Sequence, residues 1–178
     1  MRAHARLVGM SEPAPRAAKQ GVRQILTGKA EIKAAIIEAT TNADRSLAIL
    51  TPDLEPALYD QEDFLEALKR FILARGFARV RVLITHPSRA LKSGNNFVSM
   101  ARRLNSYIEF RNLRPELGER DDAFFIADER AIIYRKSADY WDAMSDPCEP
   151  AVARYYLDSF DELWHACATE PELRHSQL

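Results

Sequence analysis

The sequence predicts an α/β protein with a mixed β-sheet that is flanked by helices on both faces. Short apolar segments alternate with segments of helical periodicity over the first two thirds of the chain, which is typical of parallel strands joined by helical crossovers. Two further apolar segments follow each other across three polar residues, and this spacing predicts an antiparallel hairpin. With 178 residues, of which 47% are hydrophobic, the chain is long enough for one domain with a buried core.

The first half of the chain is predicted to form helix, strand, helix and strand. Apolar residues at helical spacing predict helices over 32–43 and 64–72, and Asp60 stands at the N-cap position of the second helix. The segments 46–51 and 80–85 are short, apolar and closely followed by proline, as expected of buried strands. Because helices connect these strands, we expect the strands to be parallel neighbours.

The second half begins with a helix that Asn95 or Asn96 caps. The alternating segment 107–111 is predicted to be a strand with one face in water. The segments 123–127 and 131–134 form the predicted hairpin, whose short turn favours antiparallel pairing. These antiparallel strands make the sheet mixed.

A long loop over 137–150 and a closing helix complete the prediction. The loop carries Trp141, which we expect either to close over the site or to lie in a dimer contact. Pro150 suits the first turn of the helix. The predicted buried stripe of this helix consists of Val152, Tyr155, Tyr156, Phe160, Leu163, Trp164 and Cys167.

The composition indicates a soluble cytoplasmic protein. Residues 1–22 lack apolar periodicity, so we expect a basic flexible arm in front of an α/β domain over 23–178. The arm lacks the apolar core of a signal peptide, and no segment is apolar enough to span a bilayer. A formal net charge of −1 excludes a polycation that binds nucleic acid or anionic lipid as a whole. Cys148 and Cys167 form neither a disulfide framework nor a zinc-site pattern.

The order of the predicted elements resembles a single repeat of the phospholipase D-like family. The match covers Gly28 to Ala168, and the closing segment Phe160-Asp-Glu-Leu-Trp164 is similar to the F-x-x-x-W ending of such domains. Thr51-Pro-Asp-Leu54 and this ending are also similar to a group of bacterial domains. For a chain with one motif, the resemblance implies a homodimer that pairs through the face bearing the site.

The H-x-K-x4-D signature of that family is degenerate here. In the family the His attacks phosphorus, the Lys neutralises the phosphoryl oxygens and the Asp supports the His. When the final Asp is aligned on Asp128, Asp121 stands at the His position and Ala123 at the Lys position. Arg135 and Lys136 stand where the G-S-x-N segment would begin. A carboxylate in place of the His, without the Lys, would repel phosphate, so the resemblance implies a domain without phosphodiesterase activity.

Polar residues that follow the predicted strands form the candidate site. Thr51 and Asp53 follow the first strand and His86 follows the second. The carboxyl ends of parallel strands meet at one edge of a sheet, so we expect these side chains to converge on one crevice with Asp121 and Asp122 nearby. Alternatively, Asp53 and His86 only cap turns beside proline.

Three functions stay open. The first is a non-catalytic module that binds a protein partner or a small anionic ligand, the latter through Thr51, Asp53, His86, Asp122, Arg135 and Lys136. The second is a phosphodiesterase or nuclease with an atypical active site, whose catalytic candidates are His86, Asp53, Asp121 and Asp128. The third is a structural accessory domain. Scattered arginines around the second and third strands keep nucleic acid among the partners. No ligand spacing indicates a metal or a cofactor.

Overall fold

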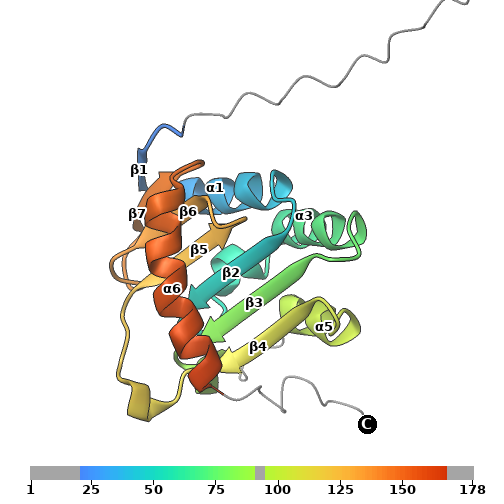
Figure 1. Ribbon diagram of the computed structural model, residues 1–178, viewed down its shortest axis with the longest axis vertical. Helices are drawn as coiled ribbons and strands as arrows, with labels where there is room; N and C mark the ends of the chain where they lie inside the picture. Colours follow the sequence, from blue (N-terminus) through green and yellow to red (C-terminus); the bar gives the residue numbers. More distant parts are fainter. Residues whose placement is uncertain (1–20, 91–94, 168–178) are drawn as a thin grey trace, which may run out of the picture.

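The computed structural model describes residues 21–90 and 95–167, which form a single mixed sheet with helices on both faces (Figure 1). The strands follow the spatial order β1-β7-β6-β5-β2-β3-β4. Their bounds are β1 Gln24–Thr27, β2 Ser46–Thr51, β3 Arg79–Ile84, β4 Ile108–Asn112, β5 Ala123–Ala127, β6 Ala131–Arg135 and β7 Asp142–Asp146. The arm predicted over 1–22 lies, up to residue 20, outside the described residues, as do 168–178 at the other end.

One long helix covers one face of the sheet, and the longer of the remaining helices lie on the opposite side. In Figure 1 helix α6 crosses in front of the sheet, whereas α1, α3 and α5 lie behind it. The helix bounds are α1 Lys29–Thr41, α2 Pro56–Tyr59, α3 Glu62–Leu73, α4 Pro87–Ala90, α5 Asn96–Arg103 and α6 Pro150–Ala166, with a 3₁₀ turn η1 at Pro115–Leu117. The described part of the chain contains no helix of the length and apolarity needed to cross a membrane.

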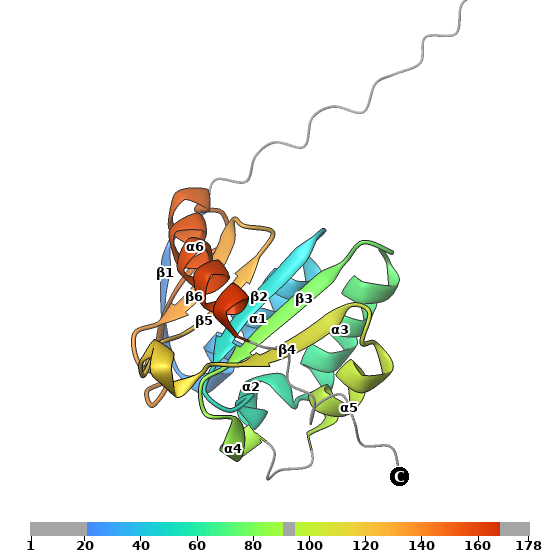
Figure 2. The ribbon, with the colours of Figure 1, turned by 60° about the horizontal axis from the view of Figure 1, so that its bottom comes forward.

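The strand directions bring several chain segments to one edge of the sheet. Strands β2, β3 and β4 are parallel neighbours. Strand β5 is antiparallel to β2, and β6, β7 and β1 then continue antiparallel to one another. The carboxyl ends of β2, β3, β4 and β6 therefore meet the amino ends of β5 and β7, and we call this the carboxyl edge. Figure 2 shows the short helices α2 and α4 close to it.

Aromatic side chains form the centre of the core on each face. Behind the sheet, Phe97 packs edge-to-face on Phe64 and on Phe110, with ring centroids 5.7 and 5.3 Å apart. Under α6, Phe160 stacks on Trp164 at 5.6 Å. The prediction that Tyr156, Phe160, Trp164 and Cys167 face the sheet is confirmed. The prediction that Tyr155 belongs to the same buried stripe is wrong, because its side chain is 73% exposed.

The predicted helices and strands are present, but two strands were missed. The prediction of a loop over 137–150 is wrong at residues 142–146, which form β7. Strand β1 was not predicted. Asn95 caps α5 as expected, since its side-chain oxygen accepts the main-chain N–H groups of Phe97 and Val98. Asp60 does not cap α3, which begins after Gln61; its carboxylate accepts the N–H of Asn96 instead.

Candidate functional site

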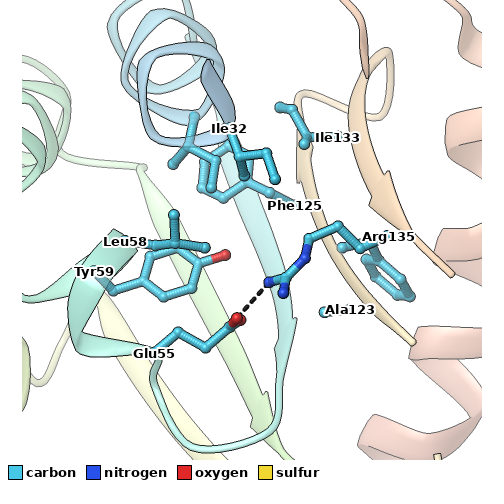
Figure 3. Close-up of a pocket in the computed structure, with 10 residues that line it drawn as sticks. Ile32, Glu55, Leu58, Tyr59, Ala123, Phe125, Ile133 and Arg135 are labelled. Atoms are coloured by element: carbon cyan, nitrogen blue, oxygen red, sulfur yellow. Dashed lines mark hydrogen bonds and ion pairs between the residues drawn. The ribbon is translucent and has the colours of Figure 1, made fainter. Parts of the chain in front are cut away.

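A buried ion pair between Glu55 and Arg135 occupies the centre of the carboxyl edge (Figure 3). Arg135 ends β6, and Glu55 lies in the turn between β2 and α2. The side chains are 3% exposed for Arg135 and 8% for Glu55. Thr51, the last residue of β2, donates its hydroxyl to Glu55 Oε2 at 3.2 Å. Burial raises the pKa of the Glu55 carboxyl, and this effect outweighs the lowering by Arg135.

The remaining donors of Arg135 hold the loop between β6 and β7. Its Nε and Nη2 donate to the carbonyl oxygen of Tyr140 at 3.1 and 2.9 Å, and Nη2 also donates to the carbonyl oxygen of Ala138. The guanidinium lies 4.7 Å from the centre of the Trp141 ring, and the Lys29 ammonium lies 5.7 Å from the same centre. Trp141 therefore covers Arg135, and no part of the guanidinium is presented to solvent as a free cation.

A cavity of about 10 Å³ adjoins the ion pair, roughly the room that one water molecule needs. Its wall is formed by Glu55 and Arg135, by Ala123 of β5 and by Tyr59 of α2, together with apolar side chains. Figure 3 shows the Tyr59 hydroxyl pointing toward the guanidinium of Arg135. Burial raises the pKa of this phenol far above its usual range. Tyr59 is therefore a neutral group at any physiological pH.

Of the residues predicted to converge after the parallel strands, Thr51 contacts the ion pair and the other two serve turns. The Asp53 carboxylate accepts the main-chain N–H of Glu55 at 3.1 Å, which shapes the turn. The main-chain N–H of His86 donates to the carbonyl oxygen of Pro52 at 2.6 Å and joins the loops after β2 and β3. Within the described residues, the His86 imidazole makes no hydrogen bond to Asp53 or to Asp121.

The acidic residues around β5 have separate surroundings. Asp121 is exposed, and its carbonyl oxygen accepts the N–H of Ala138. Asp122 forms a two-pronged ion pair with Arg120, at 2.7 and 2.8 Å. Asp128 lies at the far end of β5, where its carboxylate accepts the N–H groups of three residues that lead into β2, namely Asp44, Arg45 and Ser46.

Lys136 follows Arg135 in the sequence, and its side chain is exposed to solvent. Among the residues that the structure describes, no group of three or more His, Cys, Asp or Glu side chains is arranged to hold a metal ion. At the carboxyl edge the carboxylate of Asp53 shapes a turn, that of Asp122 is ion-paired and Asp121 is exposed, whereas the Arg135 guanidinium is enclosed.

The sequence that forms this site matches the model of a known domain family. A model of a domain of unknown function, DUF7931, matches residues 28–175. The chain belongs to the DUF7931 family. The matched region includes all the elements from α1 onward and both members of the buried ion pair. No protein with curated annotation matches the sequence.

Solved structures share the phospholipase D-like fold with this DUF7931 chain. It is similar to Nuc from Salmonella typhimurium, a phospholipase D family member, with a TM-score of 0.61 and 15% identity over 85% of this chain and 99% of Nuc. NucT from Helicobacter pylori gives a TM-score of 0.57 at 14% identity, over 85% of this chain and 100% of that one. At such identities the likeness shows the fold alone.

A larger protein also contains this fold. The archaeal chromatin protein TrmBL2, whose structure shows a novel mode of DNA binding, gives a TM-score of 0.63 at 14% identity. The match covers 90% of the DUF7931 chain and 57% of TrmBL2. The chain thus spans little more than half of that protein.

Sequence reasoning missed Glu55 and Tyr59 of the DUF7931 site. Glu55 follows Thr-Pro-Asp-Leu, a segment that predicts an exposed turn. Its burial depends on Arg135, which is 80 residues away in the sequence. The usable signal was Trp141, a large aromatic residue in a predicted loop, whose ring lies against the Arg135 guanidinium.

Proposed function

We propose that this chain is a non-catalytic phospholipase D-like domain that acts through protein–protein association and pairs with a second copy of itself. The main support for the proposal is that the Arg135 guanidinium is already bound within the protein. The guanidinium at the carboxyl edge is bound by Glu55, by two carbonyl oxygens and by the Trp141 ring. A cation that is satisfied inside the protein cannot hold a phosphoryl group without breaking these bonds.

The residues aligned with the catalytic positions of the family support the same conclusion. Ala123, at the Lys position, is buried and carries no charge. Asp121, at the position of the nucleophile, brings a negative charge to the place where a phosphodiester would bind. The chemistry needs a nucleophile with a matched base and a cation for the transition-state charge, and the aligned positions supply neither.

A small anionic ligand has less support than a protein partner. The cavity beside Arg135 has the volume of about one water molecule, whereas pockets for small molecules are typically on the order of 300 Å³ or more. Lys136 is exposed, and a single exposed ammonium group binds anions weakly. We therefore assign the function to the surface of the domain.

Hydrolysis assays test the absence of catalysis. Purified full-length protein is incubated with bis-p-nitrophenyl phosphate and with single- and double-stranded DNA, and we expect no turnover above background. Loss of one member of a catalytic unit already reduces turnover by several orders of magnitude. The His86→Ala variant is the control for the alternative site. Turnover by the parent that disappears in His86→Ala would overturn the proposal.

Thermal shift measurements test the assignment to a protein surface. Inorganic phosphate and nucleotides at millimolar concentration are expected to leave Tm of the parent unchanged, because the Arg135 guanidinium is already bound by Glu55 and covered by Trp141. A rise in Tm with phosphate that Lys136→Ala abolishes would instead support an anion site.

A further inference from the structure

A row of apolar side chains crosses the sheet on the α6 face and ends in water at its β1 edge. The strand register aligns one residue from each of six strands in this row, Leu83, Leu50, Phe124, Tyr134, Met144 and Ile25, and on β4 the aligned residue is Arg111. Under α6 the first three are buried, and Tyr134 and Met144 are half-buried. Ile25, the last, is 72% exposed. Helix α6 therefore does not cover the end of this row at β1, where Ile25 is exposed to water.

The main chain of β1 is open along the same edge. Within the described residues, β1 pairs with β7 alone. The N–H of Gly28 donates to the carbonyl oxygen of Trp141 at 2.7 Å. Because main-chain groups alternate in direction along a strand, those of Leu26 and Gly28 face β7, and those of Ile25 and Thr27 face the open edge. The Thr27 N–H is bonded to Glu31, so the Ile25 N–H and the carbonyl oxygens of Ile25 and Thr27 are the groups that offer a template to another strand.

Opposite charges stand at the two ends of this short edge. The Glu31 carboxylate accepts the N–H of Thr27 at 2.8 Å, which fixes a negative charge beside the carboxyl end of β1. Arg23 immediately precedes the strand and is exposed. When two copies of one strand pair antiparallel about Ile25, residue 23 of each copy faces residue 27 of the other. Arg23 of one copy then lies next to Glu31 of its partner, and the two-fold axis repeats the pair.

We propose that β1 is the self-association edge of this domain, where two copies join antiparallel at Ile25 into one continuous sheet. The two Ile25 residues exchange their N–H···O bonds, and the N–H of each Arg23 donates to the carbonyl oxygen of the partner's Thr27. The carbonyl oxygen of the partner's Arg23 takes the Thr27 N–H in place of Glu31, whose released carboxylate then receives the guanidinium of that Arg23. The apolar row then runs unbroken from one α6 to the other, and Ile25 is removed from water.

This inference deepens the proposed function, because it names the surface through which a second copy binds. It rests on the proposed self-association but not on the loss of catalysis. The hydrolysis assay and the association assay can therefore fail independently of each other.

Charge reversal tests the paired edge. The mass of the full-length protein is measured by light scattering and sedimentation from low to high micromolar concentration, and we expect a concentration-dependent dimer. Arg23→Glu and Glu31→Arg should each weaken association by about tenfold or more, since each places like charges together. The double variant Arg23→Glu, Glu31→Arg should restore it. Arg154→Glu is the matched control, because it makes the same change in an exposed ion pair on α6.

A main-chain readout separates this edge from other contacts. Amide exchange at Ile25 should slow as the concentration of the parent rises, whereas in Ile25→Lys the protein should stay monomeric with unchanged Tm. A parent that is monomeric at high micromolar concentration would overturn the proposal. So would association that survives Ile25→Lys, or that Arg154→Glu weakens as much as Arg23→Glu does.

Discussion

The Glu55 carboxylate and the Arg135 guanidinium meet across 80 residues of sequence in a place that solvent hardly reaches. Removing both charges from water costs several kcal/mol for each ion, and the attraction between them offsets this only in part. The pair fixes the turn after β2 against the end of β6, and through Tyr140 it also fixes the loop that leads to β7. It sets the geometry of the carboxyl edge more than it adds to stability.

The effects of mutating the two residues of the pair on the free energy of unfolding should therefore not be additive. Arg135→Met or Glu55→Leu alone leaves one buried charge without its partner and should lower the free energy of unfolding by roughly 3–5 kcal/mol. The double variant should be close to the parent or more stable. Urea denaturation of the four proteins measures the coupling. Equal losses that simply add in the double variant would contradict this view of the pair.

Stability should also fall with rising pH through Glu55. The folded-state pKa of this carboxyl is raised above its ordinary value of 4.5 by burial, so the folded protein binds the proton more tightly than the unfolded chain does. The stabilisation from Glu55 is then fully present below pH 4.5 and is lost as the pH rises through the raised pKa. Urea titrations of the parent and of Glu55→Gln across this window measure the effect. The parent should lose stability relative to Glu55→Gln as the pH rises, and the opposite slope would contradict the pKa direction.

Trp164 should be essential for a well-packed fold. Its side chain is 5% exposed, stacks on Phe160 and lies 4.3 Å from the Arg111 guanidinium. Trp164→Ala should lower the free energy of unfolding by roughly 3–5 kcal/mol, out of a total that is about 5–15 kcal/mol for a domain. The control His86→Ala should keep the denaturant midpoint of the parent. A Trp164→Ala protein with an unchanged midpoint would mean that α6 contributes little to the core.

Asp128 should be a structural residue and not a catalytic one. Its carboxylate accepts three main-chain N–H groups that precede or begin β2, and its own φ of 51° is a left-handed conformation that Asp tolerates better than most residues do. Asp128→Ala should lower the free energy of unfolding by about 2 kcal/mol or more. Asp128→Asn, which keeps an acceptor, should lower it less. Equal losses in the two variants would contradict the role as an acceptor.

Periodicity found the elements that carry large apolar side chains at regular intervals. The second predicted helix is an example, because Phe64, Leu68, Phe71 and Ile72 mark one face of α3. Strand β7 carries no such signal, since its sequence is Asp-Ala-Met-Ser-Asp. Ala143 and Ser145 are buried, but their side chains are too small or too polar to mark an apolar strand. Sheet neighbours on both sides, and not its own propensity, hold β7 in place.

The sequence indicated the edge of the sheet at which polar side chains gather, but not which of these side chains pair with each other. The rule that side chains gather at the carboxyl ends of parallel strands pointed to Thr51, which donates its hydroxyl to Glu55 of the buried ion pair. It also selected Asp53, whose carboxylate hydrogen-bonds the adjacent turn and lies outside the buried pair. Arg135 was expected to meet an anion from solution, yet its anion is the protein's own Glu55. A partner so distant in sequence leaves no local pattern to read.

The pairing of the first described strand with the last one has a consequence for synthesis on the ribosome. Within residues 21–90 and 95–167, strand β1 pairs with β7 alone, and the N–H of Gly28 donates to the carbonyl oxygen of Trp141. A nascent chain therefore carries β1 without a place to dock until residues 142–146 have left the exit tunnel. Pairings between segments so far apart are slow to form because the loop entropy must be lost first. Addition of β1 is then a late step in folding, and until it occurs the β7 side that later pairs with β1 is an open strand edge.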